Sequence, residues 1–185
     1  MRIIAGAARG RRLKAPDTTG TRPATDRVRE AVFSAIGSWV EDANVADLYA
    51  GSGSFGLEAL SRGAQSAVFV ENGRKALQTL RENVATVGLG GKVVEGPVDG
   101  FLRREQGKDA RFHLVFIDPP WDQTTDVMEG EFLALNSLLA PHGEVVASRR
   151  HTDRIPEHPE NWRVATKKRY GDTRILRYEK LESDQ

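Results

Sequence analysis

Hydrophobic residues along the middle of the chain fall into two alternating patterns. Short apolar runs predict buried strands over residues 45–50, 67–70, 93–94, 112–117 and 143–147. Between these runs, apolar residues recur every three to four positions, which is the spacing of one helix face. This spacing predicts helices over residues 57–62, 75–87, 101–104 and 131–139. Strands that alternate with helices favour a parallel sheet with helices on both faces.

The pattern changes near the C-terminal end, where two extended runs follow one another. They cover residues 162–169 and 173–180, and the turn-forming residues Tyr170, Gly171 and Asp172 separate them. Two such runs joined by a short glycine-containing turn predict an antiparallel hairpin. The expected fold class is therefore α/β: a Rossmann-like, doubly wound, seven-stranded and mostly parallel sheet with a C-terminal antiparallel hairpin.

The residues before this alternation have a pattern of their own. Two short stretches separated by glycines predict a small β-hairpin over residues 2–14. After a proline-containing loop, Thr25 or Asp26 can cap a helix whose apolar residues repeat every three to four positions. We therefore expect residues 1–40 to form an N-terminal extension and residues 41–182 to form the main domain.

Composition removes several classes of protein. The chain has 185 residues and no cysteine, which excludes disulfide bonds, a thiolate nucleophile and cysteine-bound zinc or iron–sulfur clusters. Its four histidines are scattered, so no metal site is expected. No apolar run is long enough to span a membrane. We expect a cytoplasmic protein that has neither a membrane nor a metal as its partner.

Charge is unevenly distributed although the formal net charge is only +1. Residues 1–30 contain eight Arg or Lys against three acidic residues, and residues 149–185 contain ten against seven. Residues 31–148 contain nine basic against sixteen acidic residues. Basic ends around an acidic middle favour a polyanionic partner at the ends and a different chemistry in the middle. Charges sorted by chance on a solvated surface are the alternative, and charge alone leaves both interpretations open.

A glycine-rich turn, AGSGSFG, follows the first predicted strand from Ala50 to Gly56. Glycines let the chain turn sharply into the next helix and approach a ligand closely. Glu71 ends the next strand twenty residues after Gly51, where a carboxylate can bind both hydroxyls of a ribose. Asp47 lies inside the strand, where an acid suits the sulfonium and ammonium of S-adenosylmethionine better than the pyrophosphate of NAD. A purely structural glycine turn is the alternative.

The motif Asp118-Pro119-Pro120-Trp121 follows the apolar run 112–117, at the edge where open α/β sheets bind ligands. The prolines fix the backbone and leave carbonyl groups without a local N–H partner. Asp118 and the Pro119 carbonyl can accept hydrogen bonds from an exocyclic amine, and Trp121 offers a flat face to a planar base. The motif therefore predicts a site for an amino group on an aromatic ring. A proline-rich turn with Trp121 in the core is the alternative.

The glycine turn, the strand-ending Glu71 and the DPPW motif together resemble class I S-adenosylmethionine-dependent methyltransferases that act on amino groups of nucleic-acid bases. Within that class, the sequence is similar to the RsmD family of bacterial 16S ribosomal RNA guanine-N2 methyltransferases. The similar stretches are MRIIAGAARGRRLK at the start, RPATDRVREAVF from Arg22, LYAGSGSFGLEALSRGA from Leu48 and YGDTRILRYE from Tyr170. They extend over nearly the whole chain. The family more often has tyrosine where Trp121 stands, a change that keeps the stacking face.

The resemblance implies S-adenosylmethionine as the cofactor and 16S rRNA, in the small ribosomal subunit or an assembly intermediate, as the partner. The residues expected to bind the cofactor are Asp47, Ala50, Gly51, Ser52, Gly53, Glu71, Pro97, Val98, Arg22 and Thr25. The expected catalytic residues are Asp118, Pro119, Pro120 and Trp121. The residues expected to bind RNA phosphates are Arg9, Arg11, Arg12, Lys14 and Arg27. Residues expected to extend that basic surface are Arg149, Arg150, Lys167, Lys168 and Arg169.

The expected reaction is methyl transfer from S-adenosylmethionine to the N2 amine of a guanine in 16S rRNA. An adenine-N6 methyltransferase acting on RNA or DNA would share the pocket, and a non-catalytic RNA-binding assembly factor would need no methyl donor. A protein-glutamine methylase usually carries asparagine where Asp118 stands, and an NAD oxidoreductase would need a further substrate domain. Helix capping and surface charge are alternative roles for Arg22, Thr25 and Arg27. The sequence leaves these alternatives open.

Overall fold

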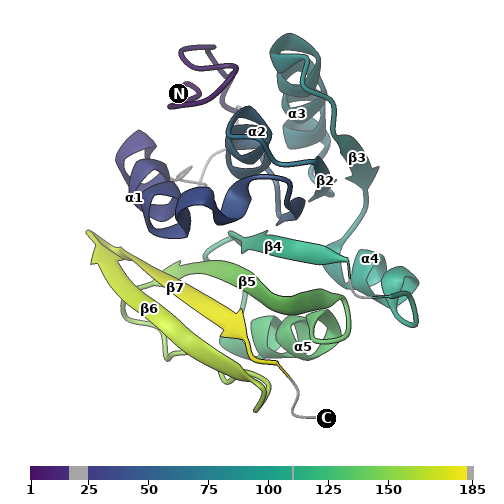
Figure 1. The fold of residues 1–185 in the computed structure, drawn as a ribbon, viewed down its shortest axis with the longest axis vertical. Helices are drawn as coiled ribbons and strands as arrows, with labels where there is room; N and C mark the ends of the chain where they lie inside the picture. Colours follow the sequence, from purple (N-terminus) through teal and green to yellow (C-terminus); the bar gives the residue numbers. More distant parts are fainter. Residues whose placement is uncertain (17–24, 110, 183–185) are drawn as a thin grey trace.

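The computed structural model describes residues 1–16, 25–109 and 111–182. Its elements are α1 (Asp26–Ile36), the 3-10 helix η1 (Gly37–Val40), β1 (Asn44–Leu48), α2 (Ser54–Ser61), β2 (Ser66–Glu71), α3 (Arg74–Val87), β3 (Lys92–Glu95), α4 (Val98–Glu105), β4 (Phe112–Ile117), α5 (Thr125–Leu135), β5 (Leu139–Arg150), β6 (Trp162–Tyr170) and β7 (Thr173–Lys180). Within the described residues, the strands form one seven-stranded sheet that lies between two layers of helices (Figure 1).

The strand order in this sheet is β3-β2-β1-β4-β5-β7-β6. Strands β1 to β5 pair in parallel, whereas β7 pairs antiparallel with both β5 and β6. The chain starts in the middle of the sheet, winds outward to β3, returns to β4 and ends in the hairpin at the opposite edge. This doubly wound topology confirms the predicted fold class. Its winding direction changes between β1 and β4, where such sheets bind ligands.

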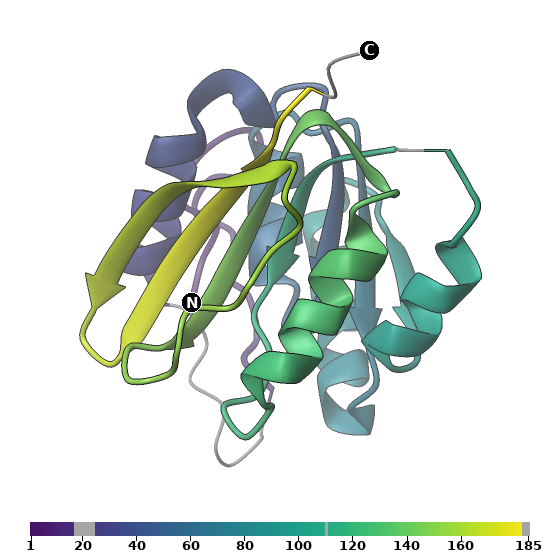
Figure 2. The same ribbon diagram turned by 90° about the horizontal axis from the view of Figure 1, so that it is seen from below.

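Two hydrophobic clusters pack on opposite faces of the sheet. Helices α1, α2 and α3 cover one face, where the ring centroids of Phe55 and Phe116 lie 4.8 Å apart. Helices α4 and α5 cover the other face and bury Phe101 and Phe132. Figure 2 shows the sheet from below, with α5 in front of the parallel strands. Because β4 is covered on both faces, its sequence is almost continuously apolar.

Helices α2, α4 and α5 begin earlier than the sequence pattern predicted, and α4 covers Val98–Glu105 instead of 101–104. Helix α2 begins at Ser54, and its Gly56 packs so closely that a Cβ atom there would lie 2.4 Å from Cε1 of Phe69. Helix α5 covers Thr125–Leu135 instead of 131–139, because its buried face includes the polar Thr125 and Glu131 and therefore lacks a clear apolar repeat. Strand β5 is correspondingly longer than the predicted run 143–147.

The N-terminal segment, residues 1–14, packs on α2. It closes on itself through an antiparallel bridge between Arg2 and Arg12, so the predicted hairpin is present as a short turn rather than as two strands. The Glu58 carboxylate of α2 accepts hydrogen bonds from the N–H groups of Ile4 and Ala5, at 2.8 and 3.1 Å. The buried residues of this segment belong to the same hydrophobic cluster as β1 and β4. A domain boundary at residue 40 stays a prediction.

In the part of the chain that the structure describes, no helix combines the length and the apolar character needed to cross a membrane.

Candidate active site

Three acidic side chains gather where the parallel strands end. Asp47 lies near the end of β1, Glu71 is the last residue of β2, and Asp118 follows β4 directly. Because β1 lies between β2 and β4, the three carboxylates share one edge of the sheet, at the change of winding direction. The structure therefore brings the glycine turn and the DPPW motif to the same edge.

The glycine loop between β1 and α2 follows a tight left-handed path. Gly51 and Gly53 have φ angles of 56° and 79°, in a region that glycine adopts without strain. The buried Asp47 carboxylate accepts a hydrogen bond from the Gly56 N–H at 2.9 Å and so closes the loop. Ser52 and Gly53, which the sequence analysis assigned to the cofactor, are buried in this loop, and the Ser52 carbonyl accepts a hydrogen bond from α3.

Glu71 connects this loop to the end of β2. Its carboxylate accepts hydrogen bonds from the N–H groups of Gly51, Asn72 and Gly73, at 2.8, 2.9 and 2.7 Å. A carboxylate has about four lone-pair positions, so three bonds fix its orientation and leave about one position for a ligand. The main-chain carbonyl of Glu71 also accepts the Gly96 N–H at 2.9 Å. This bond holds the turn before α4 beside the same edge.

Pro97 and Val98 begin α4 at that turn. Pro97 is the residue that precedes the helix, and Val98 is 3% exposed within the α4 and α5 cluster. Both residues lie next in sequence to Gly96, which bonds to Glu71. Pro97 and Val98 therefore lie beside Glu71, the candidate for binding the ribose. Their contact with an adenine stays a prediction.

The carboxylates at this edge repel one another. Burial raises the pKa of Asp47 well above its usual range, and the charges of Asp118 and Glu71 raise it further. The hydrogen bond from the Gly56 N–H acts in the opposite direction. Among the described residues, the hydrogen-bond donors to these three carboxylates are main-chain N–H groups and one serine hydroxyl, and no basic side chain pairs with them. A cationic ligand would relieve the repulsion. The ammonium and sulfonium groups of S-adenosylmethionine fit this set of carboxylate acceptors.

A cavity of about 460 Å³ opens beside Asp118, within the size range of small-molecule sites. Its walls come from the start of α1, the end of β4, β5 and the turn between β6 and β7. The Ser148 hydroxyl donates a hydrogen bond to Oδ1 of Asp118. Burial raises the pKa of Asp118, and the hydrogen bond from Ser148 lowers it. Trp121 lines the cavity, and the Arg150 guanidinium lies 5.0 Å from the centre of its ring.

The remaining predicted site residues fall into different places. Thr25 lines the cavity and caps α1, with its hydroxyl accepting the Val28 N–H at 3.3 Å. Pro119 is buried and Pro120 is exposed beside Asp118, and both hold the turn after β4. Arg22 lies outside the residues that the structure describes.

The basic residues predicted to bind RNA are not equivalent. Arg11 Nη1 donates to the main-chain carbonyls of Thr86 and Val87, at 2.8 and 2.6 Å, and Lys14 pairs with Glu82 at 2.8 Å. These contacts hold the N-terminal segment on the end of α3. The other three of these predicted residues, Arg9, Arg12 and Arg27, are exposed and have no ion pair within the described part of the chain. Arg27 also lines the cavity.

Sequence reasoning missed two features of the site. Ser148 was not singled out, because its position beside Asp118 depends on the pairing of β4 with β5. Tyr49 and Glu131 were also missed: the Tyr49 hydroxyl donates to the buried Glu131 carboxylate, and Gln123 donates to the same group at 3.4 Å. For the pair of Tyr49 and Glu131, the signal available in the sequence was an acidic residue, Glu131, among the apolar residues of the predicted helix 131–139.

Comparisons with known proteins agree with this geometry. The family described as "Conserved hypothetical protein 95" matches residues 1–179. The Escherichia coli protein "Ribosomal RNA small subunit methyltransferase D" is 36% identical over 97% of this chain and 90% of its own length. Its Haemophilus influenzae counterpart is 32% identical over 92% of this chain and 89% of its own length.

Solved structures show the same likeness. A candidate methyltransferase from Escherichia coli, yhhF, superposes with a TM-score of 0.86 at 36% identity and covers 98% of both chains. An RNA methyltransferase from Salinibacter ruber, solved with S-adenosyl-L-homocysteine, has a TM-score of 0.65 at 15% identity and covers 89% of this chain and 97% of its own, a likeness of fold alone.

The doubly wound sheet, its terminal antiparallel hairpin and the acidic edge define a class I methyltransferase that uses S-adenosylmethionine. Within that class, the match of most of the chain to one family decides the assignment. The chain belongs to the RsmD family, as its sequence motifs indicated.

Proposed function

We propose that this protein transfers a methyl group from S-adenosylmethionine to the exocyclic N2 amine of a guanine in 16S rRNA of the small ribosomal subunit. The observation that carries the proposal is the position of Asp118. Its carboxylate belongs to the acidic edge that suits a cationic methyl donor, and it also lines the cavity next to Trp121. The family relatives that cover nearly the whole chain are named as methyltransferases of small-subunit rRNA, which supports the substrate.

The cofactor side of the site consists of the glycine loop and the strand-ending acids. Glu71, fixed by its three main-chain hydrogen bonds, would accept from the ribose hydroxyls. Ala50 to Gly53 would hold the methionine part against the left-handed loop, while Asp47 attracts its positive charge. Bound S-adenosylmethionine would supply the methyl group for attack by the guanine nitrogen. The carbon–sulfur bond electrons would remain on sulfur, and the amine proton would pass to solvent.

The substrate side consists of Asp118, the Pro119 carbonyl and Trp121. A guanine amine is a weak nucleophile because its lone pair is delocalised into the ring. Hydrogen bonds from the amine to Asp118 and the Pro119 carbonyl would orient that lone pair, and Trp121 would stack on the base. Positioning of this kind supplies much of the rate without a strong base. The target base must leave its stack to enter the cavity, which favours a loop nucleotide.

The experiment is methyl transfer from tritiated S-adenosylmethionine to small ribosomal subunits that lack their methyl groups, followed by nucleoside analysis. We expect labelled N2-methylguanosine from the wild type. We expect Asp118→Ala to lose about two to three decades in rate, about 2–4 kcal/mol of barrier, while cofactor affinity is retained. Labelled N6-methyladenosine would contradict the guanine assignment, and a near wild-type rate for Asp118→Ala would contradict the role of that residue.

A further inference from the structure

A row of side chains crosses the sheet from Asp118 to the outer edge strand. Ser148 of β5 lies opposite Ile175 of β7, and Ile175 lies opposite Lys168 of β6. Directly opposed residues of paired strands point to the same face of a sheet. Asp118 joins the row through its hydrogen bond with Ser148. Because Ile175 packs in the cluster that contains α1, the whole row faces α1.

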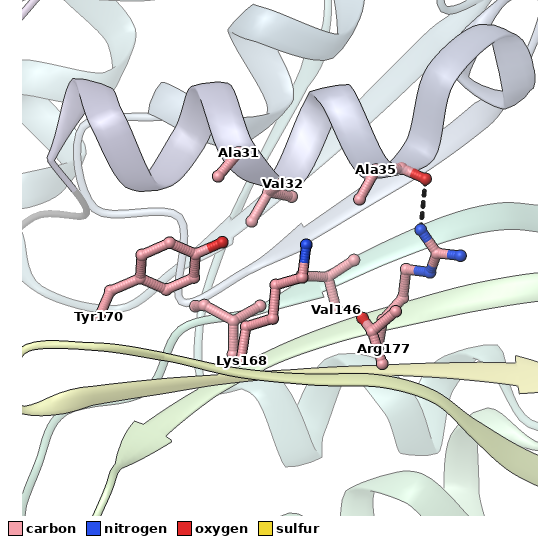
Figure 3. Close-up of a pocket in the computed structure, with 9 residues that line it drawn as sticks. Ala31, Val32, Ala35, Val146, Lys168, Tyr170 and Arg177 are labelled. Atoms are coloured by element: carbon pink, nitrogen blue, oxygen red, sulfur yellow. Dashed lines mark hydrogen bonds between the residues drawn. The ribbon is translucent and has the colours of Figure 1, made fainter.

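Two neighbouring cavities lie above this row, one beside Asp118 and one at the edge strand β6. Tyr170 and Ile175 line both the cavity beside Asp118 and a smaller one of about 20 Å³ between α1 and the C-terminal strands. Figure 3 shows Lys168 and Tyr170 of β6 pointing from the sheet toward α1. We call the surface around these two cavities the hairpin cleft, and we define it by Arg27, Arg150, Lys168, Arg169 and Tyr170.

Four basic residues from three elements meet at the hairpin cleft. Arg27 and Arg169 line the catalytic cavity, Arg150 lies over the Trp121 ring, and Lys168 lines the smaller cavity. All four are exposed, and within the described residues none pairs with an acidic side chain. Arg169 Nε donates a hydrogen bond to the Gly171 carbonyl at 2.8 Å.

Other cations of the C-terminal hairpin have acidic partners: Arg163 of β6 pairs with Glu179, and Arg177 of β7 pairs with Glu144. Asp172 is the acidic residue on the cavity wall near Arg169. Cations without acidic partners at the mouth of a cavity attract an anionic ligand.

The N-terminal segment offers fewer cations for the same purpose. Arg11 and Lys14 are already engaged by α3, through the carbonyls at the helix end and through Glu82. Among the C-terminal cations, Arg149 is 5% exposed and pairs with Asp153 at 2.6 Å. Lys167 lies opposite Leu176, which packs in the cluster on the other face of the sheet. Arg169 has the same alternation as Lys167, but it lies next to the β6–β7 turn and lines the cavity there. The structure thus separates the basic residues that line the cavities from those that do not.

We propose that the RNA backbone next to the target nucleotide binds along the hairpin cleft, with Arg27, Lys168 and Arg169 contacting its phosphates. The proposal rests on the proposed function, because it takes RNA as the substrate. The base that enters the cavity then lies at the Asp118 end of the row, and the adjoining backbone runs toward the edge strand β6. Arg150, stacked on Trp121, stands at the junction between the base and the backbone.

The test compares two double variants in the full-length protein. Arg27→Gln/Lys168→Gln removes two cations of the cleft, and Lys167→Gln/Arg104→Gln removes two exposed cations outside it, one on the other face of β6 and one on α4. The probe is a fluorescein-labelled RNA hairpin with a guanine-containing loop, and affinity is measured by anisotropy over a range of salt concentrations. Each lost contact to single-stranded RNA should flatten the slope of log affinity against log salt by about 0.7.

We expect the cleft variant to flatten this slope by about 1.4 and the control variant to leave it unchanged. Equal slopes for the two variants would overturn the proposal. A third variant, Arg9→Gln/Arg12→Gln, tests the N-terminal segment; if it alone flattens the slope, the RNA binds there and the proposal is wrong. Binding and methyl transfer are read separately. If the variants show the expected slopes but the wild type forms no N2-methylguanosine, the proposed function is refuted and RNA binding at the hairpin cleft is retained.

Discussion

Glu131 makes the stability of this protein depend on pH in a direction that can be worked out from the structure. Its side chain lies on the buried face of α5 with 4% of the residue exposed, and it accepts hydrogen bonds from Tyr49 and Gln123. Burial raises the pKa of Glu131 to about 7, and the charge of Asp99 adds to the rise. The two hydrogen bonds and the charge of Arg149 oppose it. In the unfolded chain a glutamate titrates near 4.3.

The raised pKa means that the folded state holds a proton that the unfolded state has already released. The contribution of Glu131 to stability is therefore fully present below about pH 4 and is lost as the pH rises through about 7. With about 1.4 kcal/mol per pKa unit, the full loss amounts to about 4 kcal/mol. Glu131→Gln removes the titration and keeps a carbonyl that can accept from Tyr49. Between pH 5 and pH 8, the unfolding free energy of Glu131→Gln relative to that of the wild type should rise by about 2–3 kcal/mol.

The assay is urea unfolding of the wild type and Glu131→Gln at pH 5, 6, 7 and 8, with unfolding free energies compared at each pH. Comparing the two proteins cancels the titration of all other groups. Glu160→Gln, which removes an exposed carboxylate, is the control and should follow the wild type. If the difference between the wild type and Glu131→Gln stayed constant from pH 5 to pH 8, Glu131 would not carry a buried charge and the reasoning would be refuted.

Three further outcomes test the site and its support. Glu71→Ala should weaken cofactor binding before it slows transfer, and unchanged affinity in calorimetry would refute the ribose assignment. Ser148→Ala removes a donor that lowers the pKa of Asp118, so the acid limb of the rate profile should move to higher pH, and Ser148→Thr should restore it. Gly56→Ala places a Cβ 2.4 Å from the Phe69 ring and should lower the unfolding free energy by about 1–3 kcal/mol. Gly130→Ala, with nothing within 4 Å, should raise it by up to about 1 kcal/mol, and equal effects would contradict the packing argument.

Local sequence patterns determined most of the elements and the position of both candidate binding motifs. A strand covered on both faces, such as β4, has to be apolar along its length, and the acid that ends it has to lie at the sheet edge. The glycine turn, Glu71 and the DPPW motif were recognisable because each requires particular residues within a few positions. Thr25 was recognisable as a helix cap for the same reason, and the structure shows that bond.

Features that depend on distant partners were decided by the tertiary structure. The start of α5 was hidden because the polar Thr125 lies on its buried face. The buried Glu131 on that face bonds to Tyr49, which is far away in the sequence. Ser148 became part of the site through the pairing of β4 with β5. The sign and number of basic residues were readable from the sequence, but their partners were not. Arg11 and Arg149 are bound within the protein, whereas Lys168 lines a cavity without an acidic partner among the described residues, because ion pairing depends on which helix or strand the fold places opposite each side chain.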